Sequence, residues 1–216
     1  EIRKLPAGHM LIADATGQVT EPIEYWDIPT SAPSDLHSEN EWLGRLGEAV
    51  GESVQRQLVS DVPLGAFLSG GVDSSLVVSA MGSAKTFSIG FDDPSYNELP
   101  FSKEVATHLG TQHNTRVIKP YVADIFDDLM HYMDDPIGDF SIFPTYLVSK
   151  LARESVTVCL SGDGGDELFG GYETYVAQQM AERYAKIPNM LRSIIGSIAR
   201  TLPPTSRKKG LTNKVK

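Results

Sequence analysis

The sequence predicts an α/β protein, in which a parallel, twisted sheet has helices on both faces and is preceded by a short β segment. From about residue 36 onward, short and nearly all-apolar runs alternate with stretches of helical periodicity. Strands that are buried on both faces have this composition, and alternation with helices is typical of parallel sheets. Two glycine-rich turns each follow an apolar run and open a helix. Ligands of such sheets bind at the carboxyl ends of the strands, where these turns lie.

The first 35 residues have a different pattern, which predicts a small antiparallel patch and a linker. Three extended runs between residues 2 and 25 are separated by turns that contain glycine or proline. A stretch rich in Pro and Ser follows at 29–34. We therefore expect one boundary in the chain, between a segment at 1–35 and a sheet domain at 36–216.

The predicted sheet domain begins with a long helix at 38–58. Ser38 followed by Glu41 forms a capping box, in which each residue bonds the other's backbone N–H. From Trp42 to Leu58, apolar residues recur at the spacing of one helix face.

The remaining elements follow in alternation. Apolar runs predict strands at 63–68, 86–91, 113–118 and 156–160. Helical periodicity predicts helices at 74–81, 98–109, 121–133 and 144–154. Pro144 suits the opening of the last helix, because proline there gives up no helix hydrogen bond. The stretch 168–202 is expected to be mainly helical, interrupted at Pro188, and to start a further helical layer.

Composition narrows the classes of function. The net charge of −9 and the pI near 5.0 disfavour general nucleic-acid binding, because an acidic surface repels phosphate backbones. The basic run within 206–216 is expected to be a solvated tail. No apolar run approaches the ~20 residues of a membrane helix, so we expect no membrane association. Cys159 is the single cysteine and is expected to be a core residue. Without a disulfide framework, we expect a reducing, cytoplasmic location.

The first motif with chemical character lies between a predicted strand and a predicted helix, and it consists of Leu68-Ser69-Gly70-Gly71-Val72-Asp73-Ser74-Ser75. Adjacent glycines let the backbone turn sharply and approach a ligand. The free N–H groups and positive end of the following helix make an anion site, to which the serine hydroxyls add donors. Asp73 alone would repel phosphate, so we expect it to hold a magnesium ion beside the phosphates.

An ordinary strand-to-helix turn is the alternative, and two glycines alone would favour it. Three serines and an acid in this context favour the phosphate interpretation. The loop is not a Walker A loop, because the Lys-Ser/Thr ending is missing.

The second motif also follows an apolar run, and it consists of Ser161-Gly162-Asp163-Gly164-Gly165-Asp166-Glu167-Leu168-Phe169-Gly170-Gly171-Tyr172. Asp163 and Asp166 crowd one turn, which is costly unless they share a cation or a reacting proton. Acids that match a helix dipole are the alternative. That alternative accounts for Glu167, but it explains the surrounding glycines less well.

Two further acidic features are weaker. Asp134-Asp135-Pro136, followed by Asp139, is explained at least as well by a turn as by a substrate loop. Tyr96-Asn97-Glu98 is interpreted as a loop and a helix cap.

At the two glycine-rich motifs the chain resembles the PP-loop ATP pyrophosphatases, which implies a Rossmann-like fold of the adenine nucleotide alpha hydrolase type. It resembles more closely the synthetase domain of glutamine-dependent asparagine synthetases. The similarity covers most of residues 36–175, and the two loops in this order are highly specific. Further matching segments are Phe87-Ser88-Ile89-Gly90-Phe91, the run 104–110 and the run 144–150. The runs 4–9 and 25–26 are similar to the tail of that family's glutaminase domain.

The resemblance implies roles for individual residues. The pyrophosphate part of ATP would be held by Ser69, Gly70, Gly71, Asp73, Ser74 and Ser75. Leu68 and Ile89 would contact the adenine, and Ser161 and Gly162 would line the ribose and α-phosphate. Asp73 and Asp166 would ligate magnesium. Asp163 matches a position that is important for forming or using the acyl-adenylate, where many family members carry Glu.

The reaction that the resemblance implies starts with attack of the aspartate side-chain carboxylate on the α-phosphorus of ATP. Pyrophosphate leaves, and ammonia then displaces AMP to give asparagine. In the full enzyme, a glutaminase domain with an N-terminal cysteine supplies the ammonia, and that cysteine is missing here. The family's catalytic lysine would lie beyond Lys216. We therefore expect a fragment with weak activity or none as a complete enzyme, and a homodimer is a further expectation.

Three alternatives stay open at this point. Related amidotransferases that act on a sugar acid or a β-lactam precursor share the same loops. A module that binds nucleotide without turnover would keep the fold, although the retained acids argue against it. A tRNA-modifying relative is disfavoured by the acidic charge and the lack of a Cys-x-x-Cys pair.

Overall fold

The computed structural model describes residues 2–29, 38–93, 97–119, 122–135, 137–189 and 192. Contacts divide the chain into two units, residues 1–45 and 46–216. The predicted boundary between residues 35 and 36 lies outside the described ranges and stays a prediction. Among the described residues, no helix combines the length and apolar character needed to cross a membrane.

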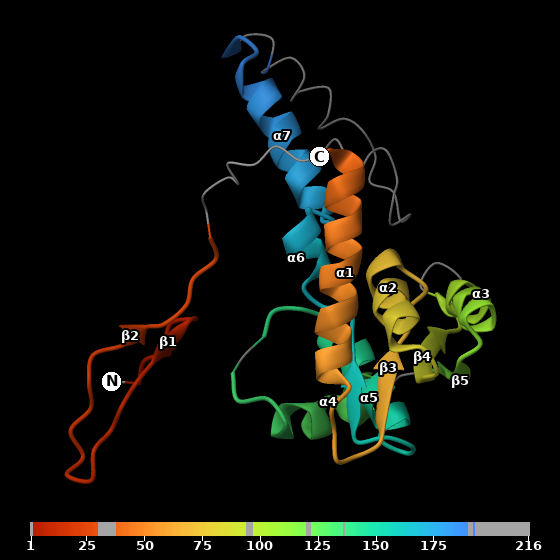
Figure 1. The fold of residues 1–216 in the computed structure, drawn as a ribbon. Coiled ribbons are helices and arrows are strands. Elements are labelled where there is room, and N and C mark those ends of the chain that lie inside the picture. Colours follow the sequence, from red (N-terminus) through yellow and green to blue (C-terminus); the bar gives the residue numbers. More distant parts are fainter. Residues whose placement is uncertain are drawn as a thin grey trace. The chain divides into compact units, whose positions relative to one another are not determined.

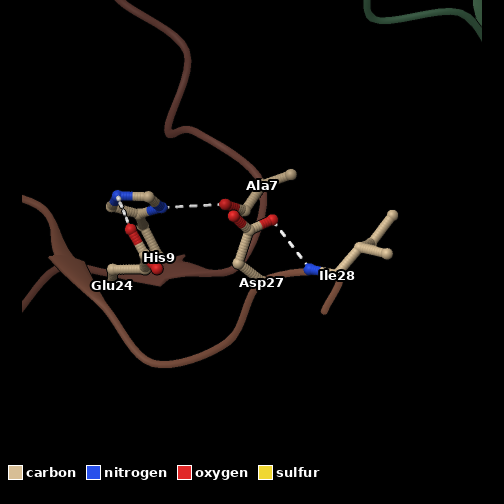
Figure 2. Close-up of polar contacts among 5 residues, drawn as sticks. All are labelled: Ala7, His9, Glu24, Asp27 and Ile28. Atoms are coloured by element: carbon tan, nitrogen blue, oxygen red, sulfur yellow. Dashed lines mark hydrogen bonds and ion pairs between the residues drawn. The ribbon is translucent and has the colours of Figure 1, made fainter. Parts of the chain in front are cut away.

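The first unit contains the predicted antiparallel patch. Strand β1 (His9–Met10) pairs with β2 (Ile23–Glu24). Figure 2 shows the His9 ring between two neighbours. Its Nδ1 donates to the Ala7 carbonyl oxygen at 2.8 Å, and its Nε2 lies 4.0 Å from Glu24 Oε2. The ring therefore links the chain before β1 to the paired strand β2.

Helix α1 (Glu39–Gln57) begins with the predicted capping box. The Ser38 N–H and hydroxyl donate to Glu41 Oε2 at 2.7 and 2.8 Å, and the Glu41 N–H lies 3.4 Å from Ser38 Oγ. These hydrogen bonds, the one from the Ser38 N–H first, hold the pKa of the Glu41 carboxyl below its usual value. The cap prediction is confirmed.

The second unit is built on a four-stranded sheet, whose strands are β3 (Leu64–Phe67), β4 (Lys85–Phe91), β5 (Gln112–Ile118) and β6 (Val158–Leu160). The strand order is β5-β4-β3-β6, and all three pairings are parallel. Figure 1 labels three of these strands, β3, β4 and β5. The carboxyl ends of all four strands therefore meet at one edge of the sheet.

The helices of this unit, besides the end of α1, are α2 (Val72–Met81), α3 (Leu99–Leu109), α4 (Val122–His131), α5 (Ile142–Ala152), α6 (Gly165–Phe169) and α7 (Glu173–Ala185). One buried cluster joins α2 and α3 to the sheet through Val78 and Ala106. The other joins α5 to the sheet through Leu151 and Phe87. Because neighbouring residues of a strand point to opposite faces, the burial of both Thr86 and Phe87 shows that both faces are covered. The predicted fold class is confirmed.

The predicted elements differ from the observed ones mainly from residue 156 onward. Strand β6 starts at Val158 rather than at 156. The predicted helical stretch 168–202 contains α7 and the end of α6, which are separated by the unpredicted break at Gly170 and Gly171. Apart from Arg192, the part of that stretch beyond residue 189 lies outside the described residues, as does the basic run within 206–216.

Candidate nucleotide site

The first glycine-rich loop connects the end of β3 to the start of α2. Gly71 is the N-cap of α2, and as a glycine it has no side chain that could bond the first N–H groups of the helix. The first N–H groups of a helix lack partners within it. They therefore stay available to an anion at the end of the loop, where the helix dipole is also favourable.

The serines of this loop mostly bond within the loop. Ser74 Oγ lies 2.9 Å from Ser69 Oγ, and it accepts a hydrogen bond from the Ser69 N–H at 3.3 Å. Ser75 Oγ donates to the Gly71 carbonyl oxygen at 2.6 Å. Ser74 is buried, whereas Ser69 is exposed. These bonds hold the loop in one shape before any ligand arrives, and Ser69 is the hydroxyl best placed to meet one.

The second glycine-rich loop leaves β6, the strand next to β3, and packs directly on the start of α2. A Cβ atom at Gly162 would lie 2.6 Å from the Ser74 nitrogen and 2.9 Å from the Asp73 carbonyl carbon. Real Cβ atoms do not approach backbone that closely, so glycine is required here for close contact. A Cβ atom at Gly165 would likewise meet the Asp73 side chain at 2.6 Å from Cγ. The two loops therefore touch.

A cavity of about 580 Å³ opens where the loops meet, and most of the predicted site residues line it. These are Leu68, Ser69, Gly71, Asp73, Ser74, Ile89, Ser161, Gly162, Asp163 and Asp166. Gly70 and Ser75 do not line it. Gly70 lies against the backbone of Phe101 and Ser102 at the start of α3, and Ser75 is bonded to the loop itself.

Other residues line the cavity that the sequence did not single out as site residues. Glu98 precedes α3, Asp139 and Thr145 come from the start of α5 and the loop before it, and Tyr172 is the N-cap of α7. Asp139 was noted as an acid but was explained equally well as a turn former. It does form such a turn, since its Oδ1 accepts the Ser141 N–H at 2.9 Å, and it also faces the cavity.

The cavity is strongly acidic. Its carboxylates are Asp73, Glu98, Asp139, Asp163, Asp166 and Glu167, and none of its described lining residues is Lys, Arg or His. The Ser141 N–H lowers the pKa of the Asp139 carboxyl below its usual value. The Tyr172 hydroxyl donates to Glu167 Oε1 at 2.6 Å, which lowers the pKa of Glu167 and raises the pKa of Tyr172 to about 12. A polyphosphate would therefore need a cation to enter this cavity.

The carboxylates fit a magnesium ion that is shared with phosphates. Among the described residues, no group of three or more His, Cys, Asp or Glu side chains forms a complete metal cage. Magnesium usually uses one or two carboxylates, with substrate phosphates and water completing the shell. Asp73 and Asp166 both line the cavity, and Gly165, next to Asp166, packs on Asp73. Two carboxylates on touching loops match that donor set.

Cys159 takes no part in this cavity. It is half-buried and packs against the cluster around Phe87 and Leu151. Burial raises the pKa of its thiol to about 11, which leaves almost no reactive thiolate at neutral pH. The interpretation as a core residue is confirmed.

Comparison with known proteins agrees with this arrangement. Residues 45–216 match the family model described as asparagine synthase. A putative glutamine-hydrolysing asparagine synthetase 2 from Methanocaldococcus jannaschii is 38% identical over 97% of this chain and 41% of that protein. Glutamine-hydrolysing asparagine synthetase 1 from Bacillus subtilis is 38% identical over 80% of this chain and 28% of that protein.

A putative glutamine-hydrolysing asparagine synthetase from Mycobacterium bovis is 30% identical over 99% of this chain and 34% of that protein. The chain thus spans about two fifths or less of the length of these relatives. With the matched residues running through both glycine-rich loops and every strand of the parallel sheet, the chain belongs to the asparagine synthase family.

Proposed function

We propose that this chain carries the ATP-using part of an amide-forming synthetase. It would adenylate the side-chain carboxylate of aspartate and release pyrophosphate, and ammonia would then convert the acyl-AMP to asparagine. The observation that carries the proposal is the contact between the two loops, which gathers the residues proposed to bind phosphate and a group of acidic residues around one cavity. Membership of the asparagine synthase family supports the same reaction class.

The proposed nucleotide position follows from the two loops. The pyrophosphate part would lie at the start of α2, against Ser69, Gly71 and the open N–H groups of the first turn. Gly70 and Ser75 would act on this position indirectly, through the shape of the loop. In return for the lost hydration, the phosphate oxygens would gain oriented backbone donors, which need no rearrangement during the reaction.

The adenosine part would lie across the neighbouring strand ends. Leu68 is 1% exposed, so it can offer the adenine only a small edge, and Ile89 is half-buried in the cavity wall. The Leu68 carbonyl oxygen already accepts a hydrogen bond from the Ser88 hydroxyl, which fixes the position of this edge. Ser161 and Gly162 would line the ribose and the α-phosphate.

The acidic residues of the cavity would have two different roles, metal binding and proton transfer. Asp73 and Asp166 would hold magnesium, which when bound neutralises the charge of the departing pyrophosphate. Asp163 is exposed and faces the cavity, so its carboxylate can accept a proton from the attacking ammonia at the amidation step. A carboxylate is a poor electrophile, which is why adenylation has to precede amidation.

Release of pyrophosphate tests the proposal directly. The chain is incubated with ATP, magnesium, ammonium and aspartate, and is compared with Asp73→Asn and with the matched control Asp61→Asn, an exposed acid outside the cavity. We expect release that depends on aspartate, that falls at least about tenfold in Asp73→Asn, as in loss of a preorganised electrostatic contact, and that survives in Asp61→Asn. Release that does not depend on Asp73 would contradict the assignment of this loop.

Two alternatives have their own outcomes in the same assay. Release that requires a different carboxylate, such as a sugar acid or a β-lactam precursor, would change the acceptor but keep the chemistry. Binding of ATP by calorimetry without any release would identify a nucleotide-binding module. A glutaminase partner, a homodimer and a cytoplasmic location stay predictions.

A further inference from the structure

The turn between α6 and α7 is anchored on one residue of the second loop, Asp166. The N–H groups of Gly170 and Gly171 both donate to the Asp166 carbonyl oxygen, the latter at 3.0 Å. Two donors on one carbonyl end α6 abruptly and fix the backbone of Asp166 relative to the turn.

A side-chain hydrogen bond closes the same turn on its other side. The Tyr172 hydroxyl, from the N-cap of α7, donates to Glu167 Oε1 in α6 at 2.6 Å. Both side chains line the acidic cavity. The bond thus links the last residue of the turn to the residue next to Asp166, and it engages one oxygen of Glu167.

The Asp166 carboxylate lies against the backbone of this closed turn. A Cβ atom at Gly171 would overlap Asp166 Oδ1 and would lie 3.0 Å from Asp166 Cγ. The place of the carboxylate is therefore set by the place of Gly171, which lies between the two ends that the Tyr172–Glu167 bond joins. If the turn opens, the carboxylate loses the surface that holds it.

We infer that Tyr172 is a positioning residue for the divalent ion: by bonding Glu167 it closes the turn that holds the Asp166 carboxylate toward the cavity. The inference rests on the proposed function, which makes Asp166 a magnesium ligand. The hydrogen bond also holds the Glu167 carboxylate on Tyr172, so that this carboxylate does not compete with Asp166 for the ion. Residues that orient metal ligands in this way are part of how proteins set metal affinity.

Binding of Mn²⁺ to the 216-residue chain, with a saturating non-hydrolysable ATP analogue, tests the inference without any turnover. Free Mn²⁺ is counted by its paramagnetic resonance signal. Tyr172→Phe removes only the hydroxyl, and we expect it to raise the Mn²⁺ dissociation constant about tenfold, the low end for loss of such a partner. Glu167→Gln keeps an acceptor oxygen and should stay closer to the parent chain. Tyr175→Phe, a neighbouring tyrosine outside the cavity lining, is the matched control and should have no effect.

Two more variants separate positioning from general damage. Asp166→Asn removes the proposed ligand and should weaken Mn²⁺ most. Gly171→Ala displaces the carboxylate directly and should weaken Mn²⁺ even though Tyr172 is intact. The melting temperature of Tyr172→Phe should match that of Tyr175→Phe. If Tyr172→Phe binds Mn²⁺ like the parent while Asp166→Asn does not, the inference is wrong and the proposed function stands. If the parent chain takes up no Mn²⁺ with the nucleotide, both are wrong.

Discussion

At the scale of single residues, Gly162 is one of the points at which the two loops touch. Its missing side chain lets the second loop lie against the Ser74 nitrogen and the Asp73 carbonyl carbon. In Gly162→Ala, backbone would have to move on at least one loop, and both loops would contact the phosphates. We expect a folded protein whose affinity for Mg–ATP, measured by calorimetry, falls about 5- to 150-fold, because overpacking costs about 1–3 kcal/mol.

The control for this change is Gly47→Ala, also a glycine-to-alanine substitution. Gly47 lies in α1, where an added Cβ meets nothing within 4 Å. It should leave the affinity unchanged and stabilise the helix slightly. Equal affinity in both variants would show that close contact of the loops does not matter for binding.

A second residue, His113, makes the stability of the folded protein depend on pH. Its Nδ1 lies 2.9 Å from the hydroxyl of Thr86, which lies 2.9 Å from that of Thr111. Its Nε2 is buried and has no hydrogen-bond partner among the described residues. Burial therefore lowers the pKa of His113 below its ordinary value of 6.5.

The unfolded chain takes up a proton at His113 more readily than the folded chain. The contribution of neutral His113 to the free energy of unfolding is therefore complete above pH 6.5 and is lost as the pH falls below that value. We expect the free energy of unfolding, measured with denaturant, to fall less between pH 7 and pH 5 in His113→Gln than in the parent. His108→Gln, on the exposed side of α3, should keep the slope of the parent. An unchanged slope in His113→Gln would contradict the assignment.

At the scale of elements, helix α2 carries the N–H groups that are available to an anion. The buried face of α2 packs on the sheet and holds the helix in place. Val78 is fully buried against the sheet, whereas Val72, in the first turn of the same helix, is 82% exposed. Deleting a buried valine's methyl groups loses their burial and leaves a cavity. We expect Val78→Ala to cost about 2–3 kcal/mol of unfolding free energy.

The matched change on the same helix, Val72→Ala, should stay within about 0.5 kcal/mol, as exposed substitutions do. Both variants are compared by urea denaturation, with Mg–ATP affinity measured in parallel. Equal losses of stability would mean that α2 is not held through its buried face.

The elements that could be predicted from the sequence are those with local sequence signals. The alternation of strands and helices follows from composition and spacing, and the α1 cap follows from Ser38 and Glu41 alone. The helical periodicity of the region does not predict the break between α6 and α7, which forms because the N–H groups of Gly170 and Gly171 both donate to the Asp166 carbonyl oxygen. Strand β6 is shorter than its apolar run, since Val156 belongs to the core just before the strand begins.

The site also shows that sequence patterns reveal local features but not the residues that the fold brings together. Both glycine-rich loops could be found locally, because each carries its chemistry within a few residues. Glu98 and Asp139 reach the cavity from two other segments, and only the assembled sheet edge brings them to the loops. For Asp139, a turn-forming role and a cavity-lining role look identical in sequence, and the residue performs both.

At the scale of the whole molecule, the negative charge of the cavity lining predicts how nucleotide binding depends on cations. The described lining combines six carboxylates with no basic side chain. We expect ATP to bind at least an order of magnitude more weakly in EDTA than in magnesium, because unscreened like charges repel strongly in a partly enclosed site. Adenosine, which is uncharged, should bind equally in both. ATP affinity that is indifferent to EDTA would mean that basic groups outside the described lining meet the phosphates.

The order of strands in the sheet has a consequence for how this protein emerges during synthesis. Strand β3 pairs with β4 early in the chain, but its other edge waits for β6, whose Leu160 pairs with Ala66. Until the ribosome has made β6, an apolar central strand remains open to unwanted partners, as unpaired edges are. The ligand cavity cannot exist before that moment either. A nascent chain paused between α5 and β6 should therefore depend on chaperones more than the finished one.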